Sequence, residues 1–436
     1  MTAGIARTRL VVATDVRFWR RETGAQQRIA ELVKYLSEHA FDVTTLFLGP
    51  IAETTTTTND RLLITAANLK VISLVEDWQP QGWWDSIRWR CNCIFAAWRQ
   101  RWNRNDAQLS SPDSIQRIRS KRLPEFRSAE FQRRFRSCVA RLQPHAVIVE
   151  YITLFYLVPD RSQRAGVLYA VDTHDVLSMR HQQFKQHGYE HWVALSRNEE
   201  AAAIDSFDVV IAIQPEEAAI FRSFVSQHQP VVVAGMAGQL HVAAADNRST
   251  RQPADSISIG ILASNNAANQ HALSWFLAEV WPILLAGHDS LRLIIAGSTT
   301  KSLAGERPLD RVQILGPVQQ VADFYALVDI VVNPIQFGTG LKIKNIEAMC
   351  FGKPLVTTKQ GIAGSDQSVG TDYPWLVANT ADEMAQQLLQ LSCDKNLRER
   401  LTRSAQQYVT SELQADKTYR ELVAALSSCQ KNHPVS

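Results

Sequence analysis

The residues best suited to chemistry lie in the stretch Phe337–Gly352, which reads FGTGLKIKNIEAMCFG. It follows a short apolar run, Ile330–Val332, that is typical of a buried parallel strand. Two glycines, Gly338 and Gly340, then bracket Thr339 in a turn that leads into a segment with helical spacing. A strand that passes through glycines into the start of a helix can hold phosphates, because backbone N–H groups and the helix N-terminus favour an anion.

The helical segment after this turn carries charges of both signs. Lys342 and Lys344 follow Leu341 in its first turn, where positive charge favours phosphate binding. Glu347 lies about one turn further along. A carboxylate there cannot favour a phosphate, so we expect it to accept hydrogen bonds from hydroxyls, as an acidic residue does on a nucleotide ribose. Phosphates together with ribose indicate an activated nucleotide.

Short apolar runs that alternate with amphipathic segments must position these residues. Such alternation predicts parallel sheets covered by helices on both faces, and therefore an α/β fold. In the first half we expect strands at Leu10–Thr14, Val43–Leu48, Val71–Leu74, Ala146–Val149, Val167–Val171, Val209–Ile213 and Val231–Val233. In the second half we expect strands at Ile257–Leu262, Leu291–Ala296, Val312–Leu315, Ile330–Val332 and Leu355–Thr357.

This alternation is interrupted once, by the polar segment ADNRSTRQPADS, which has the composition of a linker. We therefore expect an N-terminal Rossmann-like domain over residues 1–245, with a basic, Trp-rich helical insert at about 76–144. The linker is expected at 246–256, and a second Rossmann-like domain at 257–410. A final helix at 411–436 is expected to pack back on the first domain. Ligands of such sheets lie at the carboxyl ends of the strands, so the two domains could face each other across a cleft.

Composition excludes several classes of protein. With 45% hydrophobic and 20% charged residues the chain is globular rather than disordered. Its six cysteines form no CxxC or Cys/His group, which predicts reduced thiols and no structural zinc. No apolar run approaches the roughly 18 residues that a membrane-spanning helix needs, and the N-terminal run is too short for a signal peptide. We expect a cytoplasmic protein that does not bind nucleic acid, since the net charge is only +3.

The positive charge is concentrated in the expected insert. Residues 76–144 hold 14 Arg or Lys against 7 Asp or Glu, together with six of the 11 tryptophans. Within Trp83–Trp102, an apolar stripe at helical spacing has arginines on its flanks. Such a helix could lie at an anionic bilayer as a peripheral membrane contact. The alternative is that the stripe packs on the core of the first domain, and nucleic-acid binding is a third, weaker option.

Several segments of the second domain resemble the retaining glycosyltransferases of family 4, which have the GT-B architecture of two Rossmann-like domains. The resemblance rests chiefly on residues 334–364 (PIQFGTGLKIKNIEAMCFGKPLVTTKQGIAG). It is supported by LRLIIAG at 291–297, LGPV at 315–318, DFYALVDIVVNP at 323–334 and ANQHALSWFLAEVWP at 268–282. In the first domain the match is thinner and consists of Gly24 after the first strand and of Asp172–Val176 (DTHDV).

This resemblance implies transfer of a hexose from a nucleoside-diphosphate sugar to an acceptor, with retention of anomeric configuration. Glu347 matches the carboxylate that the family places on the donor ribose. The family's donor-lining loop corresponds to Gly340, Leu341 and Lys342, and Ser264 lies in the loop after the domain's first strand. His174 occupies a position where the family often has a histidine near the reacting sugar. On the acceptor side we expect Gly24, with Arg21 and Glu22 beside it.

The chain departs from the family at two places. A second carboxylate often stands eight residues before the ribose carboxylate, and here that position is Thr339. Many members also carry an Arg and a Lys after the first strand of this domain, whereas residues 263–266 read ASNN. We expect Lys342 and Lys344 to supply the missing charge, because the diphosphate must be neutralised as it leaves. No Asp-x-Asp motif occurs, so we expect no metal and no cofactor beyond the sugar nucleotide.

Two functions remain open from the sequence. The first is a GT-B glycosyltransferase acting on a saccharide or lipid-linked acceptor, in the synthesis of a surface polysaccharide or glycolipid. The second is a non-catalytic GT-B protein that binds ligands or serves as a partner subunit. A dinucleotide-dependent dehydrogenase is disfavoured, because no GxGxxG motif follows the first strand of either domain.

Overall fold

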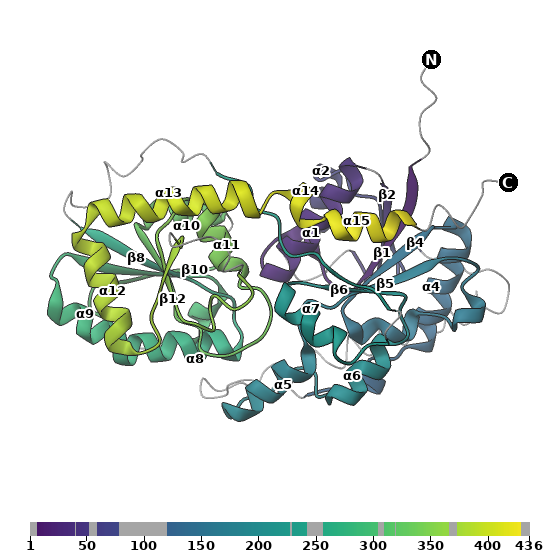
Figure 1. Ribbon diagram of the computed structural model, residues 1–436, viewed down its shortest axis with the longest axis horizontal. Coiled ribbons are helices and arrows are strands. Elements are labelled where there is room, and N and C mark those ends of the chain that lie inside the picture. Colours follow the sequence, from purple (N-terminus) through teal and green to yellow (C-terminus); the bar gives the residue numbers. More distant parts are fainter. Residues whose placement is uncertain are drawn as a thin grey trace, which may run out of the picture.

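The computed structural model describes residues 7–39, 41–51, 59–77, 120–226, 229–241, 256–303, 309–318, 320–365 and 373–428. Figure 1 shows two α/β bodies side by side, each built around one sheet. The basic, Trp-rich segment Trp83–Trp102 and residues 246–255 of the expected linker lie outside the described residues. For these segments the sequence-based expectations stay predictions.

The first domain contains a seven-stranded parallel sheet of order β3-β2-β1-β4-β5-β6-β7. Its strands are β1 Thr8–Thr14, β2 Phe41–Phe47, β3 Val71–Ser73, β4 Ala146–Glu150, β5 Leu168–Asp172, β6 Val209–Ala212 and β7 Val231–Val233. The helices are α1 Gly24–Glu38, α2 Asp60–Ala66, α4 Ala129–Leu142, α5 Leu177–Gln186, α6 Arg197–Ile204 and α7 Pro215–Arg222. Four short 3-10 helices are η1 Phe18–Arg20, η2 Leu123–Phe126, η3 Ile152–Leu157 and η4 Arg161–Gln163.

The second domain contains a six-stranded parallel sheet of order β10-β9-β8-β11-β12-β13. The strands are β8 Ile257–Leu262, β9 Leu291–Ala296, β10 Val312–Gly316, β11 Ile330–Asn333, β12 Leu355–Thr357 and β13 Trp375–Val377. The helical elements are α8 Ala267–Trp275, η6 (π) Phe276–Val280, α9 Trp281–Gly287, η7 (3-10) Ser298–Leu303, α10 Val321–Leu327, α11 Ile343–Cys350, α12 Ala381–Cys393 and α13 Lys395–Glu412.

The strands form where the sequence predicts buried parallel strands, because both faces of each sheet are covered. In β1, Val11 and Ala13 belong to one core cluster, whereas Leu10 and Val12 belong to the cluster on the opposite face. Burial on both faces is the physical reason that these strands read as continuous apolar runs. The expected fold class, two Rossmann-like domains in the GT-B arrangement, is confirmed. The sequence reading missed only β13, a three-residue strand at the edge of the second sheet.

The chain crosses back to the first domain at its C-terminal end. Helix α13 runs along the second domain, where it contacts α11 and α12, and α14 (Ala415–Thr418) and α15 (Arg420–Ser427) follow it. Figure 1 shows α15, in yellow, on the first domain. Its anchors are Tyr419, Leu422 and Leu426, which are fully buried in the core cluster of that domain. The two domains are therefore joined by two chain segments.

One small apolar cluster contains residues of both domains. Phe184 at the end of α5 packs edge to face on Phe337 of the second domain, with ring centroids 5.2 Å apart. Tyr189, in the loop after α5, stacks on the same Phe337 ring at 5.6 Å. The turn that follows Phe337 is consequently held against the first domain.

Candidate functional site

A cavity of ≈290 Å³ lies between the two domains. Its walls include residues that follow β8 and β11 in the second domain, and residues that follow β1 and β4 in the first. In both sheets these strand pairs are the points at which the strand order reverses. Open α/β sheets bind ligands at such switch points, beyond the carboxyl ends of the strands. Topology alone therefore marks this cavity as the candidate site.

Most of the residues singled out by sequence line this cavity. They are Gly24, His174, Ser264, Gly338, Thr339, Gly340, Leu341, Lys342 and Lys344. Arg21, Glu22 and Glu347 are not among the lining residues. The Arg21 guanidinium instead pairs with Glu31 on the outside of α1, at 2.5 Å, and is about half exposed. Gly24 is the first residue of α1 rather than a loop residue, since Thr23 caps the helix with its side chain.

Two backbone N–H groups of the Gly338–Gly340 turn are already hydrogen-bonded to the first domain. The Gly338 N–H donates to the side chain of Gln183 at 2.7 Å, and the Gly340 N–H donates to Glu217 at 2.9 Å. Between them, the Thr339 hydroxyl donates to Asp175 at 2.9 Å. We call these three hydrogen bonds the interdomain clasp. Side chains of the first domain therefore occupy the amides of Gly338 and Gly340 in this conformation, and phosphate binding by the turn stays a prediction.

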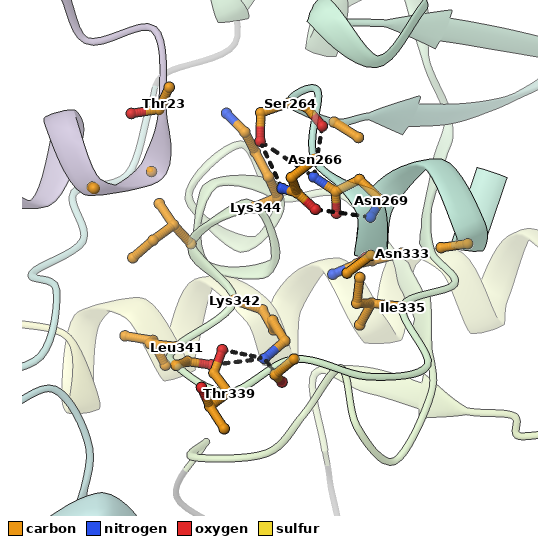
Figure 2. A pocket seen from close by; sticks show the side chains of 18 of the residues that line it. Thr23, Ser264, Asn266, Asn269, Asn333, Ile335, Thr339, Leu341, Lys342 and Lys344 are labelled. Atoms are coloured by element: carbon orange, nitrogen blue, oxygen red, sulfur yellow. Dashed lines mark hydrogen bonds between the residues drawn. The ribbon is translucent and has the colours of Figure 1, made fainter. Parts of the chain in front are cut away.

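Lys342 is also engaged by the turn. Its ammonium donates to the carbonyl oxygens of Gly338, Thr339 and Gly340, at 2.8 to 3.2 Å, and Figure 2 shows it beside Thr339 with dashed bonds. These three acceptors use all three ammonium protons. Burial lowers the pKa of Lys342 to about 8, against the opposing effect of Asp175. In this conformation Lys342 therefore stabilises the turn, rather than serving as the free cation that the sequence led us to expect.

Glu347 lies on α11 and is only 6% exposed. One carboxylate oxygen accepts from Lys344 at 2.7 Å and lies 3.4 Å from the Tyr325 hydroxyl. The other, Oε1, is buried and has no hydrogen-bond partner among the described residues. A buried carboxylate oxygen without a partner is costly, and a ligand hydroxyl would satisfy it. Lys344 lines the cavity, whereas Glu347 is not among the lining residues.

Ser264 belongs to a small polar network after β8, seen in Figure 2. The Asn269 side-chain amide donates to the Ser264 carbonyl at 2.8 Å and to its hydroxyl at 3.2 Å. Asn266 caps α8 through its side chain. The network shapes the second-domain wall with neutral groups only, in agreement with the absence of a cation at residues 263–266.

On the first-domain wall, His174 lies in a buried polar cluster. Its Nε2 is 2.6 Å from the Glu150 carboxylate, and its ring stacks on Tyr151 with centroids 4.0 Å apart. Both Tyr151 (φ 68°) and His174 (φ 58°) adopt the left-handed backbone region that such residues rarely occupy. Strained backbone of this kind concentrates at functional sites. Nδ1 of His174 makes no hydrogen bond with the described residues, which leaves it available to a ligand.

The acids of this cluster are partly neutralised by an arginine. Glu150 and Asp172 end adjacent strands in direct register, and both are fully buried. Arg28 of α1, fully buried as well, donates to Asp172 at 2.5 Å and to the carbonyls of Ala234 and Gly235. Burial, followed by the Asp172 charge, raises the pKa of Glu150. The Glu150 carboxyl therefore loses its proton less readily than an exposed glutamate does.

The same cluster is the one group of potential metal ligands among the described residues. Glu150, Asp172 and His174 each offer a ligand atom, all within 4.8 Å of one another. Arg28 already supplies a positive charge to Asp172 at this point, and His174 is bound to Glu150. An added dication would meet a guanidinium in its immediate surroundings, so the donor set fits a metal poorly.

Sequence reasoning missed several lining or contacting residues of the first domain. Glu150 ends a buried apolar run, and Asp175 follows His174 shortly after another such run. A charged residue at or just after the end of a predicted buried strand was therefore the signal available in the sequence. Arg180, Gln183 and Glu217 lie on α5 and α7. Nothing in their sequence surroundings indicates a site, because only the docking of the second domain brings them to the turn.

Comparison with known proteins agrees with this geometry. Residues 257–394 match the family model described as "Glycosyl transferases group 1". No curated protein sequence matches the chain. Among the described residues, no helix has both the length and the apolar character needed to cross a bilayer.

Solved structures of similar fold span almost the whole chain. A sucrose-phosphate synthase from Thermosynechococcus elongatus has a TM-score of 0.67 and 13% identity, and covers 98% of this chain and 100% of its own. Anabaena HepE in complex with UDP and glucose has a TM-score of 0.64 and 13% identity, covering 97% and 100%. A TarM mutant of S. aureus, in complex with Fondaparinux, alpha-GlcNAc-glycerol and UDP, has a TM-score of 0.65 and 10% identity, covering 96% and 99%. At these identities the likeness establishes the fold.

Proposed function

We propose that this protein is a glycosyltransferase that transfers a hexose from a nucleoside-diphosphate sugar to a saccharide or lipid-linked acceptor, with retention of configuration. The observation that carries the proposal is Glu347, whose buried Oε1 lacks a partner among the described residues and whose other carboxylate oxygen is bound by Lys344, a residue that lines the cavity. A ribose hydroxyl would satisfy this acceptor. The match of residues 257–394 to glycosyl transferases group 1, and neighbours whose structures contain UDP, support the same choice.

The chemistry follows from a cavity that offers orientation and charge, and whose lining carboxylate, Asp175, is already bound to Arg180 and Thr339. The bond between the sugar C1 and the diphosphate oxygen breaks, and the acceptor oxygen bonds to C1 on the same face. The acceptor proton passes to the departing phosphate oxygen, which balances the step. The protein contributes by holding both substrates and by stabilising charge on the leaving group. His174 would contact a sugar hydroxyl through Nδ1, with its ring held by Glu150.

The direct test is a panel of UDP-, GDP- and ADP-sugars, assayed for binding, hydrolysis and transfer. Binding of one nucleotide sugar followed by turnover is the expected result, and an α-configured donor should give an α-linked product. If none of the nucleotide sugars binds at up to millimolar concentration, the proposal is wrong. Activity unchanged by EDTA is expected, because Arg28 supplies the positive charge at the one cluster of potential metal ligands found in the described part of the chain.

A specific observation favours a second candidate, the non-catalytic GT-B protein. Thr339 replaces a carboxylate that the family resemblance leads us to expect, and in the structure its hydroxyl is used to bind Asp175. Such a protein could bind a nucleotide sugar and still not transfer it. The same panel separates the two candidates, since binding without hydrolysis or transfer identifies the second.

We further propose that the protein is cytoplasmic and acts on surface polysaccharide or glycolipid synthesis through a peripheral membrane contact. This rests on the basic, aromatic stripe of Trp83–Trp102. Co-sedimentation with liposomes containing anionic lipid should be strong for the wild type and weak for Trp98→Glu. Equal binding of both proteins to the liposomes would contradict the proposed membrane contact.

A further inference from the structure

Four side chains that carry full positive charge line the cavity within the described part of the chain: Arg28, Arg180, Lys342 and Lys344. Two of them, Arg28 and Lys342, are already fully engaged. Arg28 binds Asp172 and two carbonyls, and Lys342 binds three carbonyls. A diphosphate entering the cavity would have to break existing bonds to recruit either of these two. Lys344 donates one hydrogen bond, to the Glu347 carboxylate.

Arg180 differs, because half of its guanidinium is unused. Nη1 donates to Asp175 at 2.8 Å and lies 3.4 Å from the Thr339 carbonyl. Nε is buried and has no partner among the described residues, and Nη2 makes no hydrogen bond with them. In a planar guanidinium the Nε–H and one Nη2–H point in the same direction. These two donors form a fork that matches two oxygens of a phosphate or carboxylate.

We propose that Arg180 binds the diphosphate of the nucleotide sugar through this fork, and so supplies the cation that the loop after β8 lacks. This inference rests on the proposed function, and names the residue of the first domain that would contact the donor. Asp175 orients the guanidinium by holding Nη1, and the Phe184 ring lies 5.4 Å from its central carbon. Both contacts fix the side chain before a ligand arrives, which lowers the entropy cost of binding.

The neighbouring acids leave room for an anion. Asp175 is paired with Arg180 and also accepts from Thr339. Burial, followed by the Asp175 charge, raises the pKa of Glu217 to about 8, so Glu217 is largely protonated at neutral pH. A diphosphate near Arg180 would consequently meet one paired carboxylate rather than two free ones. Since Arg180 lies on α5 and Glu347 on α11, the donor would bridge the two domains.

The test compares UDP, GDP and ADP with their nucleosides by calorimetry, using Arg180→Met, Arg180→Lys and the wild type. Loss of two charge-assisted hydrogen bonds should weaken nucleoside diphosphate binding roughly 10- to 100-fold in Arg180→Met. Arg180→Lys keeps the charge but not the fork, and should lose less. Nucleoside affinity should not change in either variant. Arg21→Met, which removes an exposed arginine outside the cavity, is the matched control and should bind like the wild type.

Pyrophosphate serves as a second probe, since it needs no base or ribose. If pyrophosphate binding depends on Arg180 but no nucleotide binds, Arg180 is a diphosphate-binding residue and the proposed function fails. If nucleotides bind equally well to the wild type and to both Arg180 variants, the proposed function survives and the inference is overturned. Equal weakening of nucleoside and nucleoside diphosphate would also overturn it, because that result indicates a general structural effect.

Discussion

The interdomain clasp should respond to pH through Glu217. This side chain is 2% exposed, and its carboxylate accepts the Gly340 N–H of the second domain. Burial, followed by the Asp175 charge, raises its pKa from 4.5 to about 8. The sign follows directly: a raised pKa in the closed form means that closure is most favourable below about pH 4.5, and that this advantage is lost as the pH rises through about 8.

The magnitude follows from the size of the shift. If opening of the domains restored the ordinary pKa, the shift would favour closure by a few kcal/mol at most, because the Gly340 N–H and Lys342 of the second domain act in the opposite direction and lower the pKa of Glu217. Lys342 also faces Glu217, and burial lowers its pKa to about 8. The protonation change of Lys342 falls above about pH 8 and favours closure there. Below about pH 8, a change in domain closure with pH is therefore attributed to Glu217.

Small-angle X-ray scattering between pH 5 and 8 would measure this response as an increase in radius of gyration. Glu217→Gln keeps an acceptor for the Gly340 N–H but cannot ionise, so its radius should stay constant over the same range. Glu216→Gln, at the neighbouring exposed position, is the matched control and should behave like the wild type. The reasoning fails if Glu217→Gln expands in parallel with the wild type, or if the wild type becomes more compact as the pH rises.

Three further predictions concern single side chains. Arg28→Met should lower the free energy of unfolding by about 3–5 kcal/mol in guanidinium titrations, because Asp172 is left as an uncompensated buried charge; Arg28→Met combined with Asp172→Asn should recover part of the loss. Gly340→Ala should raise the radius of gyration at pH 5, since φ is +79° and a Cβ would collide with the Asp175 carboxylate; a radius equal to that of the wild type contradicts this. Glu347→Gln should weaken UDP binding about tenfold but leave 2′,3′-dideoxy-UDP unaffected, and an equal loss for both ligands would argue against a ribose contact.

The fold could be predicted from the sequence because its signal is local and repeated. Each buried parallel strand must be apolar on both faces, so runs such as Ile257–Leu262 and Leu291–Ala296 indicate strands without knowledge of their neighbours. The Gly338–Gly340 turn and Glu347 were visible for a similar reason, since the glycines and the carboxylate occur at fixed spacing within one strand–turn–helix unit. β13 was missed, because three residues at a sheet edge carry too little pattern.

The tertiary structure determines the hydrogen-bond partners of the side chains in this site. The sequence by itself determined the two α/β domains, the cavity-lining turn and the lysines beside it. Only docking of the domains brought Asp175, Arg180 and Glu217 against that turn, across more than 120 positions of sequence separation for Gly340 and Glu217. Whether the ammonium group of a lysine is free or hydrogen-bonded depends on which acceptor atoms the folded chain brings close to it. For that reason the sequence assigned the free positive charge to Lys342 and Lys344, whereas in the structure the turn engages Lys342 and Arg180 holds unused donors.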